Sequence, residues 1–178
     1  MRKKNQSNEF IRECIGNATF ELMKTIHFYD ISISSICKKA GFGRTTYYRH
    51  FPNRKEDIII SYIRILWKKY KNEHIDAVKN DEGKELMKYM YANKNIFLLI
   101  YHQNLFHILY DFYDQEFGVD ENDDPILAYG KSMFVGLFFG VGYEWMKQGC
   151  KDSADEISKK IEQGIAIAVA LSQKNQIS

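Results

Sequence analysis

Residues 33–58 read ISSICKKAGFGRTTYYRHFPNRKEDI, and this segment is the most informative about the fold. Its first part, residues 33–40, has apolar side chains at helical spacing, and Ser32 before it is a favourable N-cap. Gly41 stands where helices often end in a left-handed residue, and residues 44–50 can form the next helix. Two short helices joined by a tight, glycine-containing turn predict a helix-turn-helix.

The flanking segments complete a three-helix head and lead into a body. Residues 9–26 carry apolar side chains at helical spacing and predict a first helix that packs across both short ones. Gly43 is a modest N-cap for the third helix, and Pro52 ends that helix because proline disfavours helical geometry in the residue before it. Asn53 is then expected to cap a long amphipathic helix over residues 54–74.

The third helix presents residue types that read DNA. Arg44 can donate two hydrogen bonds to guanine, and Thr45 and Thr46 can bond a base or contact a thymine methyl. Phosphates are expected to meet Tyr48, Arg49 and His50, the hydroxyls of Ser32 and Ser34, and Arg54 or Lys55. Tyr47 and Phe51, four residues apart, are expected in the core. Each contact residue alone could be an ordinary surface residue, but their clustering on one short basic helix favours function.

Positive charge is concentrated in the first part of the chain. Residues 1–71 contain 15 Lys and Arg against 6 Asp and Glu, a net charge of +9, whereas residues 72–178 contain 10 against 17, a net charge of −7. This asymmetry predicts a basic module that meets a polyanion, joined to a body that does not. Surface charge can also segregate without any functional reason.

Residues 33–58 resemble the signature of TetR-family transcriptional regulators. The resemblance covers a whole module at consistent spacing. It implies a dimer that binds a palindromic double-stranded operator, most often a repressor released by a small-molecule effector. It also implies that Arg44 and Thr45 face bases, and that the DNA backbone is held by Thr46, Tyr48, Arg49, His50 and Arg54 or Lys55.

The chain departs from this family's usual pattern in three places. His27 stands where glycine is common, and Gly43 stands where serine is common, so one phosphate-directed hydroxyl is missing. After Phe51 the chain carries one extra residue, which leaves the choice between Arg54 and Lys55 open.

The rest of the chain shows only helical patterns, so we expect an all-α protein of about nine helices. Residues 1–53 would form the helix-turn-helix DNA-binding head, and residues 54–178 a helical effector-binding and dimerisation domain. The later helices are predicted at residues 82–92, 94–117, 125–148, with Asp124 as N-cap and Pro125 in the first turn, and 153–173. Helix 94–117 could be kinked.

The last two predicted helices resemble those that dimerise in TetR-like proteins. Gly136 and Gly140 are four residues apart and leave a smooth strip that another helix can approach closely. The last helix carries a stripe formed by Ile157, Ile161, Gly164, Ile165 and Ala168. The core of a monomer would show the same stripes, so a homodimer rests on the resemblance and on the two-fold symmetry of a palindrome.

Aromatic residues are dense in the predicted body and suggest a pocket for a small apolar or aromatic effector. The candidate lining residues are Phe97, Tyr101, His102, Phe106, Tyr110, Phe134, Phe138 and Trp145. The alternative is the ordinary core of a helix bundle. His102 and His107 are five residues apart and poorly spaced for one metal, so neither a metal nor another cofactor is expected.

Other classes of protein have little support in the sequence. The three cysteines are far apart and form no metal-binding or disulfide pattern. The N-terminus does not have the pattern of a signal peptide. The most apolar stretch, residues 133–146, is interrupted by Glu144 and is shorter than the roughly 20 residues that span a bilayer. We expect a cytoplasmic protein without a membrane partner. No catalytic motif is recognisable, so we expect no enzyme. The alternatives are a TetR-like activator, a regulator controlled by a protein partner instead of a small effector, and a nonspecific DNA binder.

Overall fold

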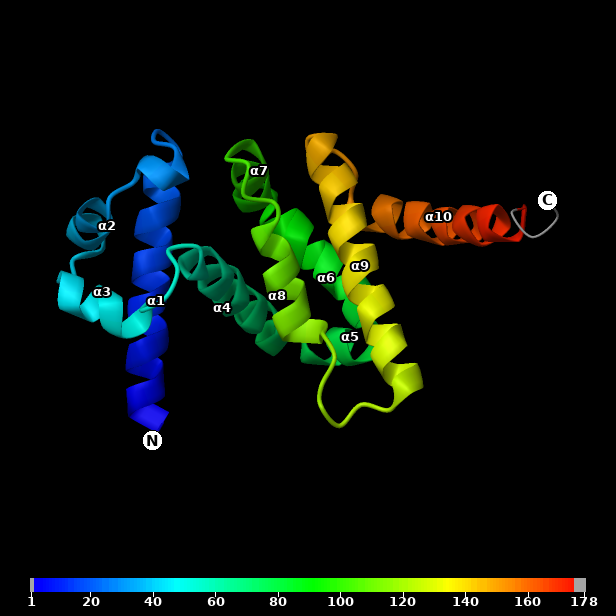
Figure 1. Ribbon diagram of the computed structural model, residues 1–178, viewed down its shortest axis with the longest axis horizontal. Coiled ribbons are helices and arrows are strands. Elements are labelled where there is room, and N and C mark those ends of the chain that lie inside the picture. The colour runs from blue at the N-terminus through cyan, green and yellow to red at the C-terminus, as the bar shows by residue number, and fades with distance from the viewer. Residues whose placement is uncertain (1, 175–178) are drawn as a thin grey trace.

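The protein is all-α over the residues that its structure, a computed structural model, describes. These are residues 2–174, with the side chains of 2–7, 168 and 171–174 excepted. The helices are α1 (Arg2–Met23), the short 3-10 turn η1 (Phe28–Asp30), α2 (Ile33–Ala40), α3 (Arg44–His50), α4 (Asp57–Glu73), α5 (Ile75–Asn80), α6 (Glu82–Ala92), α7 (Lys94–His102), α8 (Ile108–Phe117), α9 (Pro125–Lys147) and α10 (Ala154–Lys174). Figure 1 shows α1 standing between α2 and α3 on one side and the remaining helices on the other.

Local capping chemistry defines α2 and α3 at the bounds that the sequence predicts. Ser32 accepts a hydrogen bond from the Ser35 amide at 3.1 Å and begins α2. Gly41 ends α2 with φ 76°, a left-handed conformation that glycine adopts without strain. The half-buried Phe42 follows, and α3 begins after Gly43. The first helix is longer than predicted at its start, and it ends at Met23 rather than near residue 26.

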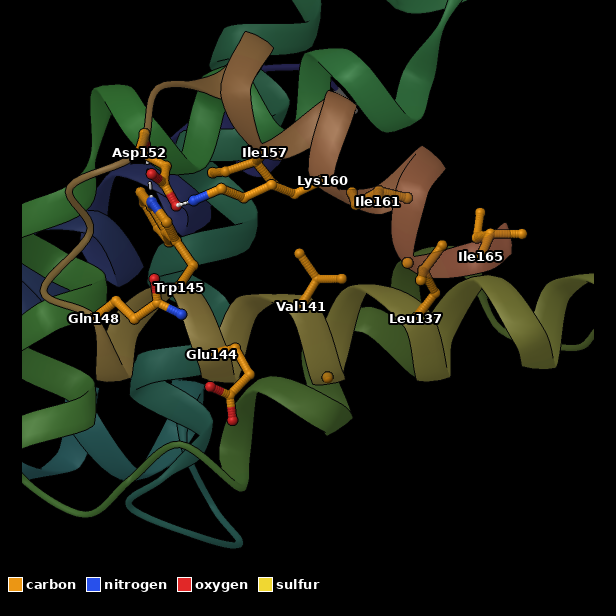
Figure 2. A pocket seen from close by; sticks show the side chains of 12 residues that line it. Leu137, Val141, Glu144, Trp145, Gln148, Asp152, Ile157, Lys160, Ile161 and Ile165 are labelled. Atoms are coloured by element: carbon orange, nitrogen blue, oxygen red, sulfur yellow. Dashed lines mark hydrogen bonds and ion pairs between the residues drawn. The ribbon is translucent and has the colours of Figure 1, made fainter. Parts of the chain in front are cut away.

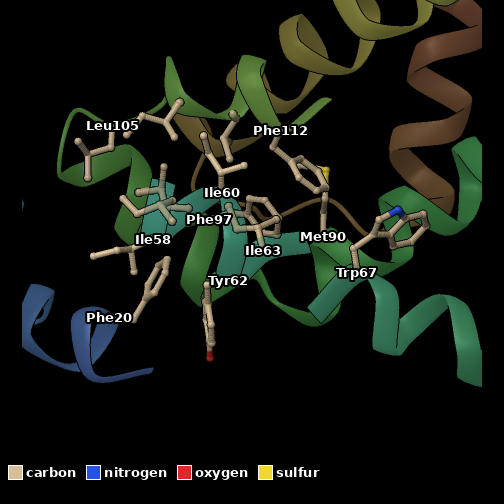
Figure 3. Close-up of a cluster of buried hydrophobic side chains, with 14 of the residues drawn as sticks. Phe20, Ile58, Ile60, Tyr62, Ile63, Trp67, Met90, Phe97, Leu105 and Phe112 are labelled. Carbon is tan, nitrogen blue, oxygen red and sulfur yellow. The ribbon is translucent and has the colours of Figure 1, made fainter. Parts of the chain in front are cut away.

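Helix α4 connects the N-terminal helices to the rest of the protein. One side of α4 packs on α1, and the other contacts α6 and α8. Its buried side chains join a hydrophobic cluster that continues from Ile15 in α1 to Ile157 in α10 (Figure 3). The predicted boundary at residues 53 and 54 therefore falls in a turn, but the buried cluster passes across it.

The start of α4 corrects the predicted helix over residues 54–74. The helix begins at Asp57, and Asn53 does not cap it. Asp57 bends back instead and accepts hydrogen bonds from the amide and the guanidinium of Arg54, at 3.3 and 3.2 Å. Arg54 and Lys55 thus precede the helix, and the first-turn charge is the favourable carboxylate of Asp57.

The predicted helix 94–117 is two helices, and a short helix, α5, was not predicted at all. The break follows α7, where Asn104 takes a left-handed conformation with φ 58°. Asparagine tolerates this conformation better than most residues. Leu105 then enters the core with no exposed surface, and α8 begins at Ile108. The turn between α7 and α8 directs Gln103 toward the N-terminal helices.

The last two helices form an open angle. As predicted, α9 begins after Asp124, whose carboxylate accepts hydrogen bonds from the amides of Ile126 and Leu127. Helix α10 extends away from the body (Figure 1). Ala154 and Ile157, near its start, are buried, whereas the described side chains after Ile161 are exposed.

Helix α9 is also the one helix within residues 2–174 whose length and composition would allow it to cross a membrane. The sequence predicts an apolar stretch too short to span a bilayer because only residues 133–146 are considered. The full helix has 23 residues. The mostly buried core helix of a soluble protein passes the same test, whereas 17% of the apolar window of α9 is buried within the described protein. Helix α9 also carries charged residues, Lys131, Glu144 and Lys147.

Candidate nucleic-acid interface

Helix α3 has an exposed face made of basic and hydroxyl-bearing side chains. Arg44 and Tyr48 are one helical turn apart, as are Thr45 and Arg49, so the four residues share neighbouring rows on the helix surface. All four are exposed, and Tyr48 has 52% of its surface accessible. Thr46, at the margin of this face, is half-buried. The face combines guanidinium and hydroxyl donors that suit base edges and phosphates.

The opposite side of α3 fixes the helix in place. Tyr47 is 2% exposed, and its ring lies 5.8 Å from that of Phe51 and 5.3 Å from that of Tyr48, edge to face in the second case. Burial raises the pKa of the Tyr47 hydroxyl to about 12. The prediction that Tyr47 and Phe51 belong to the core is confirmed. A helix held so firmly can present its outer side chains with little loss of conformational entropy on binding.

The surroundings of this face are basic. Residues 31–55 contain six Lys and Arg and no Asp or Glu. Lys38 and Lys39 at the end of α2 are exposed together with Arg44 and Arg49. Ser32 and Ser34 are also exposed, but the Ser32 hydroxyl already lies 2.8 Å from the Ser35 hydroxyl. The hydroxyl of Ser34 is therefore the more available of the two for a phosphate contact at the start of α2.

Three of the predicted phosphate contacts are buried or have partners within the protein: His50 is buried, and Arg54 and Lys55 each have partners. His50 is only 7% exposed and lies in the buried row of α3. Burial lowers the pKa of its imidazole, and the neighbouring Arg12 and Arg49 lower it further. Arg54 pairs with Asp57 and, 2.9 Å away, with Asp111 of α8.

Lys55 has a structural task that its sequence position does not reveal. Its ammonium group donates to the carbonyls of Phe28 at 2.6 Å, Ile31 at 3.1 Å and Tyr29 at 3.3 Å. It also lies 4.6 Å from the centre of the Phe28 ring. Three carbonyls occupy the three donors of one ammonium group, so between Arg54 and Lys55 the structure favours Arg54 as the residue that could turn toward a phosphate.

Lys55→Met should lower the free energy of unfolding by about 1.5–3 kcal/mol, the range for losing hydrogen bonds to a charged group. The reason is that the loop between α1 and α2 would keep carbonyls without a donor. Urea denaturation followed by circular dichroism measures this loss. Lys39→Met, at an exposed position on α2, is the control and should change stability by less than about 0.5 kcal/mol. Equal stability of the two variants would contradict the assigned task of Lys55.

Gln103 joins the body to the N-terminal helices. Its side-chain oxygen accepts a hydrogen bond from the Phe28 amide at 2.8 Å, and its amide nitrogen donates to the Met23 carbonyl at 2.8 Å. The same residue therefore caps the end of α1 and the start of η1. Lys55 and Gln103 both bond the loop between α1 and α2. A movement of the turn between α7 and α8 would therefore change the position of the loop that leads into α2.

The predicted aromatic pocket residues lie in different surroundings. Phe97, Phe138 and Trp145 are buried in the core, whereas His102 and Tyr110 are exposed. Phe106 and Tyr101 contact Tyr143 on α9 through their rings. Phe134 and Trp145 each line a cavity, but two different ones. The aromatic side chains mainly join α6, α7, α8 and α9 to one another.

An apolar groove of about 420 Å³ lies between α9 and α10 (Figure 2). Trp145 closes one end, where its indole donates to the Asp152 carbonyl at 3.0 Å. Five of the residues predicted for a dimer interface line this groove, namely Gly140, Ile157, Ile161, Gly164 and Ile165. Gly136 is exposed beside it. The side chain of Ala168 lies outside the described residues.

Among the described residues, no group of three or more His, Cys, Asp or Glu side chains could hold a metal ion. No protein-family model matches the chain, and the comparisons with curated proteins and with solved structures also returned no match.

Proposed function

We propose that the chain is a dimeric, sequence-specific DNA-binding transcriptional regulator of the TetR type. The observation that carries the proposal is the exposed face of α3, with Arg44 and Thr45 in its first turn, on a helix anchored by Tyr47. In this proposal α3 enters the major groove, Arg44 and Thr45 read base edges, and Tyr48 and Arg49 hold phosphates. Ser34 and Arg54 add further phosphate contacts at the margins.

The test is fluorescence anisotropy with DNA from upstream of the protein's own gene, against scrambled DNA of equal length, at two salt concentrations. A specific regulator binds the first duplex more tightly, and its affinity falls with salt because phosphate contacts release counterions. Equal binding to both duplexes calls for selection from random sequences. A selection that enriches no sequence would refute sequence-specific recognition.

The groove between α9 and α10 supports a homodimer as the acting form. Helix α9 exposes Ile126, Tyr129 and Met133, each with 74% or more of its surface accessible. These positions continue at helical spacing to Gly136 and Gly140. Exposed apolar surface on this scale is typical of an interaction site. A second copy could place its own α9 and α10 against these helices, which would bring two α3 helices onto the two halves of a palindrome.

Gly140→Arg should weaken dimerisation by about tenfold or more. A Cβ at Gly140 meets nothing within 4 Å in the protomer, so the folded protomer tolerates the substitution. A two-fold interface would meet the added side chain from both subunits. Sedimentation equilibrium measures the dissociation constant. Ala92→Arg, at an exposed position at the end of α6, is the matched control and should dimerise normally. An unchanged dimer in Gly140→Arg would place the interface elsewhere.

One observation favours a second form of the proposal, in which no small apolar effector acts. Several aromatic residues expected to hold such an effector instead form ring contacts between helices, and Phe134 and Trp145 line two different cavities. A TetR-like activator or a regulator controlled by a protein partner would need no such cavity. Thermal-shift screening with aromatic and aliphatic ligands separates the two forms, since bound effector stabilises the folded state.

A further inference from the structure

A polar cleft of about 540 Å³ lies where the N-terminal helices meet the body. Arg12 reaches it from α1, His50 from the end of α3, Arg54 from the following turn, and Arg64 and Gln115 from α4 and α8. A second cavity of about 450 Å³ shares Arg12, Ser61 and Arg64 with the first. The cleft is therefore large enough for a small organic molecule and has arginines from different elements in its wall.

The charges in this wall are unbalanced. Three guanidinium groups, those of Arg12, Arg54 and Arg64, line the cleft with one carboxylate, Asp57. Arg54 already binds Asp57 and Asp111. Arg64 lies 2.7 Å from Glu116 through its Nε and bonds Gln115 through its terminal nitrogen. Each of these two arginines thus has an acidic partner.

Arg12 has no such partner among the described side chains. Its one hydrogen bond goes to the Ser61 hydroxyl at 3.5 Å, which is long, and its guanidinium lies 4.9 Å from the centre of the Phe51 ring. Burial lowers the pKa of Arg12, and the nearby positive charge of Arg64 lowers it further, whereas the negative charge of Asp57 offsets part of this shift. Among the described side chains, this half-buried guanidinium forms no ion pair, although the carboxylate of Asp57 lies near enough to act on its charge.

The cleft is separate from the face of α3 that is proposed to meet DNA. His50 lies about 200° around the helix from Tyr48, at 3.6 residues per turn. The side chain of His50 is buried toward the cleft, whereas Tyr48 and Arg49 are exposed. Figure 1 shows α4 and α8 on the side of α1 away from α2. A DNA duplex on the exposed face of α3 would not need to enter the cleft, and Arg54, at its edge, is the cleft residue that is also proposed to contact a phosphate.

We propose that this cleft binds a small anion with two or more negative charges, carried by phosphate or carboxylate groups, between Arg12 and Arg64. Planar guanidinium groups match both kinds of oxyanion with paired hydrogen bonds. The Ser61 hydroxyl and the Gln115 amide offer further polar contacts. The anion would connect α1 to α4 and so reinforce one position of the N-terminal helices relative to the body. This last consequence rests on the proposed function, whereas the binding itself does not.

Isothermal titration of the full-length protein without DNA tests the binding, with pyrophosphate and citrate as probes at constant ionic strength. We expect saturable binding of one or both probes. Arg12→Gln and Arg64→Gln should each weaken it about tenfold or more, since each removes a charged hydrogen-bond donor. Lys147→Gln, an equal loss of charge on the exposed side of α9, should leave it unchanged. Absence of saturable binding, or equal binding in Arg12→Gln and wild type, would overturn the proposal.

Two further measurements separate this site from a structural role and from the DNA surface. Arg12→Gln without anion should have a melting temperature equal to or above that of wild type, because it relieves repulsion from Arg64, and it should lose the stabilisation that the probe gives. A lower melting temperature together with retained stabilisation would show a purely structural arginine. Arg49→Gln should keep probe binding while it weakens DNA binding. Loss of probe binding in Arg49→Gln would assign the anion to the DNA surface and overturn the separate site.

Discussion

Arg44→Ala is expected to weaken binding to the preferred DNA duplex by about 1–3 kcal/mol, roughly 5- to 150-fold. The Arg44 side chain is exposed at the first turn of α3, the part of a reading helix that reaches base edges. Its guanidinium can bond guanine at two positions, so its loss should also relax the preference among bases. The variant should fold normally, because an exposed side chain is removed.

Anisotropy titrations with the preferred duplex and with single-base variants of it measure this effect. Arg49→Ala is the informative comparison, since Arg49 is exposed on the same helix but is assigned to phosphate. It should weaken binding to all duplexes alike and reduce the salt dependence. If Arg44→Ala keeps both the affinity and the base preference of the wild type, α3 does not read DNA through its first turn.

Trp67→Ala should lower the free energy of unfolding by about 3–5 kcal/mol. Trp67 has no exposed surface and lies in α4, the helix that connects the N-terminal helices to the body (Figure 3). Its ring contacts those of Tyr70, Tyr89 and Phe117, with centroids 5.2–6.3 Å apart. Removal of the indole would therefore leave a cavity between several elements at once.

Trp67→Phe separates the loss of volume from the loss of polarity. The indole nitrogen is buried and finds no hydrogen-bond acceptor among the described residues. Phenylalanine keeps ring contacts and removes this donor, so we expect a much smaller loss than in Trp67→Ala. Chemical denaturation followed by circular dichroism is the measurement, because Trp145 contributes to fluorescence in every variant. Equal losses in the two variants would contradict this account of the core.

Local capping residues made the middle of the N-terminal region predictable. Ser32 and Gly41 define α2 by chemistry within a few residues, and the predicted bounds of α2 and α3 match the structure. The break between α7 and α8 was harder, because helix-forming residues continue through it. The turn also makes distant contacts: Gln103 bonds Phe28 and Met23, which are 75 and 80 residues away in the chain.

In the candidate site, too, features that depend on local residues are predictable from the sequence, whereas features that depend on distant contacts are not. The exposed face of α3 follows from helical spacing and from the buried Tyr47. The tasks of Arg54 and Lys55 depend on which distant partners they meet, Asp111 in the first case and the carbonyl of Phe28 in the second. The pocket predicted from the aromatic residues stays a prediction, since the density of rings along a sequence does not say on which sides of their helices the rings lie.

The extended α10 has a consequence for how the protein reaches its working state. A helix of 21 residues is held here mainly by its first turns, and the apolar side chains of Ile165 and Ile167, beyond Ile161, are exposed. Such a segment is marginal in water, because tertiary contacts supply most of the stability of protein helices. Helix formation in this segment and association of two chains would then be one cooperative event. For the proposed dimer, the fraction of chains with an ordered α10 would therefore rise with the concentration of the protein.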